Sequence, residues 1–127
     1  IITNMNNKGY SRIWVLFSTS TVRVTLILIT DPIVHCSICH YGSSAKLDCS
    51  FVYGFNDAQH RLSLWTDLHS VSSMVGVWIA LGDFKVVRAI GERVSFTLPN
   101  MDSIHDFNNC LGKCGLVDLS SIGLDYT

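Results

Sequence analysis

The sequence predicts a single α/β domain, and three observations support this prediction. Segments with the two-residue alternation of β-strands occur along most of the chain, and two segments with helical spacing of apolar residues lie between and after them. Hydrophobic residues make up 48% of the 127 residues, which is enough for one buried core but not comfortably for two. No internal repeat, low-complexity tract or linker divides the chain. We therefore expect one domain over residues 1–127.

The first part of the chain is typical of β-structure. Residues 12–17 and 22–29 are predicted to form a β-hairpin around the turn sequence STST. The second strand has one apolar face, and its other face becomes apolar from Ile27 onward, so we expect burial on both sides at its end. Residues 13–30 are also apolar enough to suggest a membrane span. Four hydroxyl residues and Arg23 interrupt that run, and a span needs about 20 mostly apolar residues, so we expect no membrane segment.

The stretch HCSICH, residues 35–40, contains the C-x-x-C-H pattern of haem c attachment. Residues 33–41 also have the composition of a β-strand, in which successive side chains point to opposite faces. Cys36 and Cys39 would then lie on opposite faces, whereas haem attachment or zinc binding requires both sulfur atoms on one side. We therefore predict a strand with buried cysteines, and neither haem nor zinc.

The rest of the chain alternates strands and helices. Residues 47–54 form a predicted strand, and Asn56 and Asp57 can cap the helix that follows it. The later elements are a strand at residues 75–84, a helix at 102–113 that Gly115 ends, and a short strand at 116–119. The predicted core positions are Leu62, Trp65, Leu68 and Val71 in the first helix, Val77, Ile79 and Leu81 in the strand, and Ile104, Phe107 and Leu111 in the second helix.

Charge and cysteine content narrow the functional classes. The chain has nine basic and ten acidic residues and a net charge of −1, without the basic run of a free-standing nucleic-acid-binding module. Any nucleic-acid role would therefore depend on a local site. The five cysteines make an odd number, and the polar N-terminal residues do not resemble a secretory signal peptide. We expect reduced thiols and an intracellular location.

Polar residues follow two predicted strands, at the kind of position where ligands of α/β folds collect. Tyr53 and Asn56 stand at the end of one strand, and Asp83 and Lys85 at the end of the other. The surrounding motifs are VYGFN (52–56), RLSLWTDL (61–68), VWIALGDFK (77–85), GER (91–93) and FNNCLGKCGLVDLSSIGLDYT (107–127). From RIW (12–14) to the last residue, this ordered set resembles the endonuclease domain of LINE-type non-LTR retrotransposons, especially those of plants.

The resemblance implies the endonuclease/exonuclease/phosphatase superfamily, whose fold is a four-layer α/β sandwich with two mixed β-sheets flanked by helices. Its members hydrolyse phosphodiesters with a divalent metal, so Mg²⁺ is the implied cofactor and DNA the implied partner, and a nuclear location would suit both. In the Y-x-x-N motif, Tyr53 and Asn56 would lie near the scissile phosphate. In the G-D-x-N motif, Asp83 would activate or orient the attacking water.

The chain departs from this pattern at position 85, where Lys85 replaces the Asn that helps to bind the phosphate. It also lacks the family's opening segment with an Asn, the metal-binding Glu of an E-T-like motif and the closing S-D-H segment. We therefore expect a partial sandwich, truncated at both ends. The only Glu, Glu92, falls in a segment that the resemblance does not place at the metal. On an extended segment, Lys85 would lie on the same side as Asp83 and compete with a metal for its carboxylate.

We accordingly expect an inactive relic of a DNA endonuclease domain. The side chains of Asn56 and Asp83 should converge on one cleft, with Tyr53 at its wall and Lys85 at its mouth. Two alternatives stay open for single residues: Lys85 could neutralise the phosphate in place of a metal, and Tyr53 could be a packing residue. For the whole chain, the alternative is a non-catalytic remnant that binds nucleic acid or protein.

Overall fold

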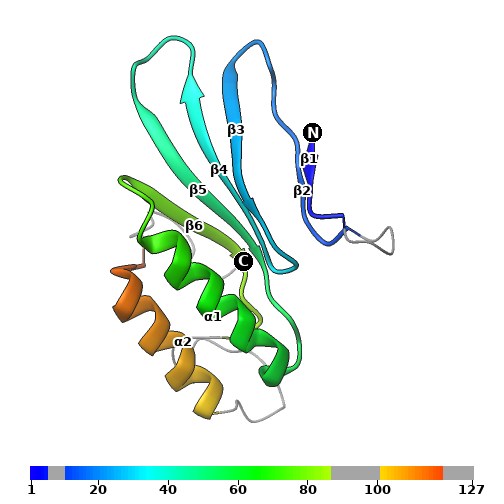
Figure 1. Ribbon diagram of the computed structural model, residues 1–127, viewed down its shortest axis with the longest axis vertical. Helices are drawn as coiled ribbons and strands as arrows, with labels where there is room; N and C mark the ends of the chain where they lie inside the picture. Colours follow the sequence, from blue (N-terminus) through cyan, green and yellow to red (C-terminus); the bar gives the residue numbers. More distant parts are fainter. Residues whose placement is uncertain (6–10, 87–100, 119–127) are drawn as a thin grey trace, which may run out of the picture.

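The computed structural model of the chain describes residues 1–5, 11–86 and 101–118. Within these residues it has an α/β fold with a four-stranded mixed sheet, a two-stranded sheet and two α-helices (Figure 1). The helices lie on one side of the larger sheet, and the smaller sheet packs on its other side. This arrangement agrees with a partial α/β sandwich.

The larger sheet has the strand order β3–β4–β5–β6. β3 (Val22–Ile29), β4 (Ile33–His40) and β5 (Lys46–Tyr53) are consecutive antiparallel neighbours joined by short turns. β6 (Trp78–Asp83) pairs with β5 in parallel, because helix α1 (Ala58–Ser72) carries the chain back to the starting end of the sheet. The carboxyl ends of β5 and β6 are therefore neighbours.

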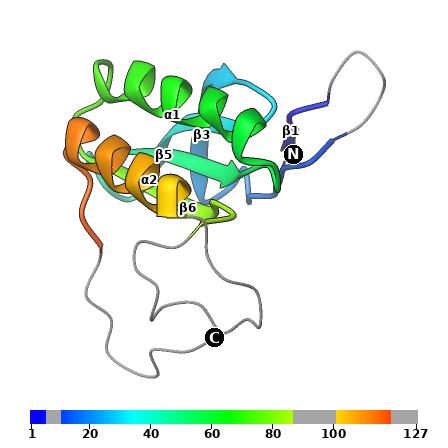
Figure 2. The same ribbon diagram turned by 90° about the horizontal axis from the view of Figure 1, so that it is seen from below.

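The main core lies between the larger sheet and the helices. α2 (Met101–Cys114) packs beside α1, as both views show (Figures 1 and 2). Trp65 of α1 stacks on Phe107 of α2, with 5.4 Å between the ring centroids. The buried members of this core are Ile33, Val52, Leu64, Leu68 and Cys110. Both helices are thus fixed to the sheet by one continuous apolar cluster.

The opposite face of the larger sheet is covered by the N-terminal residues. β1 (Ile2–Thr3) and β2 (Trp14–Val15) form an antiparallel pair. Val15 packs there with Val34 and Cys36 in a second buried cluster. Because side chains alternate along a strand, Val34 and Cys36 face this cluster while their neighbours in β4 face the helices.

Asn4 ties the small sheet to the large one. Its side-chain nitrogen donates hydrogen bonds to the carbonyls of Thr30 (3.2 Å) and Asp31 (2.6 Å), in the turn after β3. Its oxygen accepts hydrogen bonds from the backbone amides of Arg12 (2.9 Å) and Ile13 (2.8 Å). Asn4 is only 4% exposed, so these four bonds satisfy a side chain that would otherwise be costly to bury.

The hairpin predicted between residues 12–17 and 22–29 is wrong, because β2 pairs with β1. The turn itself is present: the amides of Thr21 and Val22 both donate to the Ser18 carbonyl at 3.1 Å. Before this turn, however, Ile13, Val15 and Phe17 of the first segment pack over the face of the sheet instead of extending its edge. The burial expected on both sides at the end of the second strand is also wrong, since Ile27 is 44% and Ile29 40% exposed in β3, the outer strand of the described sheet.

The strand predicted around HCSICH is confirmed. β4 pairs with β3 on one side and with β5 on the other, and its register is regular from Cys36 to Cys39. The two cysteines therefore lie on opposite faces: Cys36 is buried in the cluster beneath β1 and β2, and Cys39 is half-buried.

The predicted helices are largely confirmed, with one shift of the buried face. Asp57 caps α1, and its carboxylate accepts a hydrogen bond from the Gln59 amide at 3.1 Å. Leu64 is fully buried in α1, whereas the predicted core residue Leu62 is 43% exposed. In α2 the three predicted residues are buried, and Gly115 follows with a φ of 73°. Residues 116–118 form no strand, and the last residue of the predicted strand lies outside the described residues.

Candidate functional site

The candidate site forms where β5 and β6 end side by side. Tyr53 and Asp83 are register partners in the parallel pair, and the Gly54 amide donates to the Asp83 carbonyl at 2.7 Å. Gly82 precedes Asp83 with a φ of 135°, and a Cβ at this position would collide with the carbonyl of Val52. A glycine is therefore required for the two strand ends to approach this closely.

Lys85 occupies both oxygens of the Asp83 carboxylate. Its backbone amide donates to Oδ1 at 2.9 Å, and its ammonium lies 3.0 Å from Oδ2. Lys85 has a φ of 63°, in the left-handed region that side chains other than glycine rarely adopt. The contact expected between the two residues is confirmed, but a tight turn produces it, because β6 ends at Asp83 and the chain is not extended beyond it.

This contact changes the titration of both groups. Burial by itself raises the pKa of the Asp83 carboxyl, but the hydrogen bonds and positive charge of Lys85 outweigh it and hold the pKa below its ordinary value. The hydrogen bond to Asp83 raises the pKa of the Lys85 ammonium, and the Asp83 charge adds to this effect against the cost of desolvation. The carboxylate is therefore a weaker base than an unpaired Asp.

A second cation lies at the same place. The Lys85 ammonium is 4.7 Å from the centroid of the Tyr53 ring, and the Arg12 guanidinium carbon is also 4.7 Å from that centroid. Arg12 stacks on Phe55 as well, at 4.1 Å, and one of its nitrogens donates to the Gly54 carbonyl at 2.6 Å. Its other terminal nitrogen, Nη1, is buried and has no hydrogen-bond partner among the residues that the structure describes.

Sequence reasoning missed Arg12. The only available signal was its place at the start of the RIW stretch, where a charged residue precedes two apolar ones. Nothing in the local pattern shows that this stretch crosses the sheet near the end of β5, since that path depends on the pairing of β1 with β2. The position of the guanidinium over Tyr53 is thus a tertiary feature.

Asn56 is not joined to the other predicted site residues. It is exposed in the loop before α1, and its backbone carbonyl accepts a hydrogen bond from Arg61 at 2.8 Å. Arg61 also donates to the carbonyl of Phe55 at 2.9 Å, so its guanidinium holds this loop against the helix. Within the described residues, no hydrogen bond links the Asn56 side chain to Tyr53 or Asp83. A cleft shared by all four predicted residues stays a prediction.

The described residues around Asp83 do not fit the Mg²⁺ ion that the resemblance implies. Mg²⁺ prefers hard oxygen ligands in octahedral geometry. Here the one carboxylate accepts from an amide and faces an ammonium at 3.0 Å, so a cation would have to displace Lys85. In the described ranges, no group of three or more His, Cys, Asp or Glu side chains could hold a metal ion.

Comparison with known proteins adds no family assignment. Neither the scan against models of protein families nor the search of curated proteins finds a match to this chain. As for membranes, α1 and α2, the helices in the described part of the chain, are both too short and too polar to cross a bilayer.

Proposed function

We propose that this chain is an endonuclease-type domain, related to the DNA endonucleases of LINE-type retrotransposons, whose Asp83 site does not cleave DNA. The observation that carries this proposal is the meeting of Tyr53, Asp83 and Lys85 at the carboxyl ends of β5 and β6. This is the place in an α/β fold where a ligand usually binds. Tyr53 comes from the motif VYGFN, and Asp83 and Lys85 come from VWIALGDFK, two of the motifs that carry the resemblance.

The chemistry of phosphodiester hydrolysis explains why the arrangement supports a lost activity. An attacking water must give up a proton while negative charge builds on the phosphoryl oxygens. Asp83 is the carboxylate that could accept this proton, but Lys85 engages both of its oxygens and lowers its pKa. An Asn at position 85 could both donate and accept hydrogen bonds, whereas an ammonium can only donate.

A second candidate function is non-catalytic binding of a nucleic-acid backbone. The observation that favours it is the pair of cations, Arg12 and Lys85, that flank the ring of Tyr53. Together with the Asp83 carboxylate they leave one net positive charge at the strand ends. Positive charges of this kind contact phosphates without reading sequence.

A nicking assay on supercoiled plasmid tests the main proposal. With Mg²⁺ present, we expect neither the chain nor its Lys85→Asn variant to nick plasmid above a no-protein control. Removing Lys85 restores one donor and acceptor, but groups of this kind are each worth on the order of 3 kcal/mol, and one alone does not restore turnover. Clear nicking that disappears in Asp83→Ala would overturn the proposal of an inactive site.

Fluorescence anisotropy with a labelled DNA duplex tests the second candidate. If Lys85 contacts a phosphate, Lys85→Asn should weaken binding equally for unrelated sequences and reduce the slope of log K against log[salt] by about one. Lys46→Asn is the matched control, because it removes the same charge from the opposite end of β5. Equal effects of the two substitutions would indicate only a general charge effect and would rule out a site at Lys85.

A further inference from the structure

Two cysteines meet on α2, away from the site described above. Cys110 and Cys114 are four residues apart, and their sulfur atoms are 3.9 Å from each other. Residues at this spacing lie on the same side of a helix, one turn apart. The helix itself therefore holds the two thiols together, without help from a loop.

The separation of the sulfurs suits a shared metal ion. With metal–sulfur bonds of about 2.3 Å, as for zinc thiolates, a sulfur separation near 3.9 Å corresponds to an S–metal–S angle of roughly 115°. That angle falls between tetrahedral and trigonal coordination. Both sulfurs could thus bind one ion without a change in the helix backbone.

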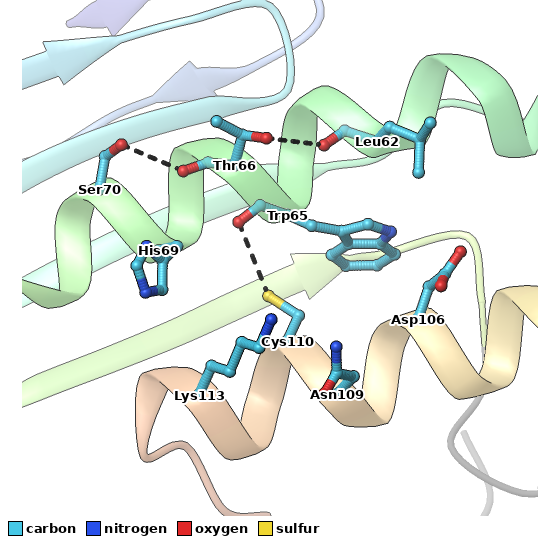
Figure 3. A pocket seen from close by; sticks show the side chains of 9 residues that line it. All are labelled: Leu62, Trp65, Thr66, His69, Ser70, Asp106, Asn109, Cys110 and Lys113. Carbon is cyan, nitrogen blue, oxygen red and sulfur yellow. Dashed lines mark hydrogen bonds between the residues drawn. The ribbon is translucent and has the colours of Figure 1, made fainter.

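The surroundings provide access and compensating charge. Cys110 is 6% exposed, but it lines a pocket of about 330 Å³ between the two helices, together with Trp65, His69 and Lys113 (Figure 3). In this view the Lys113 side chain lies beside the Cys110 sulfur. Cys114 is half-buried on the next turn. Apart from Lys113 and His69, the ionisable group on this pocket is Asp106, one turn before Cys110.

We propose that Cys110 and Cys114 form a dithiolate site for a soft monovalent cation of the Cu(I) type. Thiolates select soft ions, and at an S–metal–S angle of roughly 115° Cu(I) can bind both thiolates together with a third ligand from solution, whereas structural zinc takes four protein ligands and Mg²⁺ prefers oxygen. Binding converts two thiols and one Cu⁺ into a Cu(I) bis-thiolate with one negative charge and releases two protons. The positive charge of Lys113, which acts on the Cys110 thiol, would balance that charge.

Proton release makes binding dependent on pH. Burial, with a further contribution from the neighbouring Cys114, raises the pKa of the Cys110 thiol to about 12, against a lowering effect of Lys113. Cys110 is therefore protonated in the metal-free protein at neutral pH, and the ion must displace that proton. Because two protons leave on binding, a fall in pH opposes it.

The test is an anaerobic titration of the reduced chain with Cu(I), in competition with a chromophoric Cu(I) chelator. We expect one ion per chain. Cys110→Ser and Cys114→Ser should each lower the affinity by on the order of 100-fold or more, because a hard hydroxyl replaces a soft thiolate. Cys39→Ser is the matched control, since Cys39 is likewise half-buried but lies in β4. It should leave the affinity unchanged.

Alkylation mapped by mass spectrometry gives a second readout that does not depend on the variants folding. Bound Cu(I) should protect Cys110 and Cys114 from iodoacetamide and leave the labelling of Cys39 unchanged. Binding that survives Cys114→Ser, protection that maps to other cysteines, or no stoichiometric binding would each overturn the proposal. So would a mass loss of about two hydrogens in place of a metal adduct, which would identify the pair as a disulfide.

Discussion

The ammonium of Lys85 lies 3.0 Å from the carboxylate of Asp83, and the backbone amide of the same lysine donates to the other carboxylate oxygen. One residue thus engages both oxygens of the acid that the G-D-x-N resemblance marks as catalytic. The left-handed backbone of Lys85 makes this double contact possible, since it turns the chain back at the end of β6. The hydrogen bonds and the charge around the Asp83 carboxylate therefore depend on Lys85, the residue two positions later in the chain.

The first prediction follows from this contact. In Lys85→Asn, the pKa of Asp83 should rise, because burial remains while the lowering effect of the ammonium is lost. A pH titration of the Asp83 carboxyl carbon by NMR measures this shift. Lys46→Asn, at the opposite end of β5, should leave the titration unchanged. An Asp83 pKa that is the same in both variants would contradict the contact.

The same pair has a small effect on stability. Because the folded-state pKa of Asp83 is lowered, the pair stabilises the fold above the unfolded pKa, and this contribution is lost as the pH falls through the folded pKa. The Asp83 side chain is 55% exposed, so solvent screening keeps this contribution to stability small.

A second prediction concerns the buried face of α1. Leu64→Ala should lower the free energy of unfolding by about 2–5 kcal/mol, because Leu64 is fully buried between the helices and the sheet. Leu62→Ala, two residues earlier, should change it by about 0.5 kcal/mol or less. Urea denaturation followed by circular dichroism compares the two. A larger loss of unfolding free energy in Leu62→Ala than in Leu64→Ala would indicate that the face predicted from the sequence is the buried one.

Helix α1 also shows what the sequence can and cannot predict. Its start was predictable because Asp57 is a good N-cap, a local property of the chain. The buried face of α1 was not predictable. Leu62 and Leu64 are both apolar, and which of them is buried depends on how Arg61 packs. That arginine is only 6% exposed, and its guanidinium donates hydrogen bonds to the carbonyls of residues 55 and 56. The pattern of apolar residues alone does not contain this tertiary contact.

The candidate site also has features that the sequence predicts and features that it does not. The neighbouring positions of Tyr53 and Asp83 were predictable, because a strand–helix–strand unit places successive strand ends side by side. The positions of the two cations around these residues were less predictable. The nearness of Lys85 was expected from an extended segment but arises from a turn, and Arg12 reaches Tyr53 only because β2 pairs with β1 and not with β3.

A third prediction concerns Asn4, which bridges the two sheets. Asn4→Ala should destabilise the fold by about 1–3 kcal/mol, because it removes the partners of two amides and two carbonyls. Asn4→Asp is the matched variant: it keeps the acceptor for the amides of Arg12 and Ile13 but loses the donor to the turn after β3. In Asn4→Asp a carboxylate oxygen would face the Asp31 carbonyl, to which the Asn4 side chain donates at 2.6 Å. If this bond dominates, Asn4→Asp should lower the free energy of unfolding, measured by urea titration, more than Asn4→Ala does. A negligible effect of both substitutions would show that Asn4 does not hold the sheets together.

The last prediction concerns His35, a fully buried histidine between the sheet and the helices. Its Nδ1 lies 2.7 Å from the hydroxyl of Ser50, which also accepts a hydrogen bond from the Trp78 indole. Burial lowers the pKa of His35, although the charge of Asp48 and a hydrogen bond to the Cys49 backbone act in the other direction.

Because the folded-state pKa of His35 is below the unfolded value near 6.5, the unfolded chain binds a proton more readily than the folded one. Stability should therefore be complete above about pH 7 and fall as the pH drops through 6.5 towards the folded pKa. Urea midpoints measured between pH 7.5 and 5 should decrease in the natural chain and in His69→Gln, which changes an exposed histidine of α1. In His35→Leu this decrease should be much smaller, whatever the stability of that variant at pH 7.5. The same pH dependence in all three proteins would exclude His35 as its source.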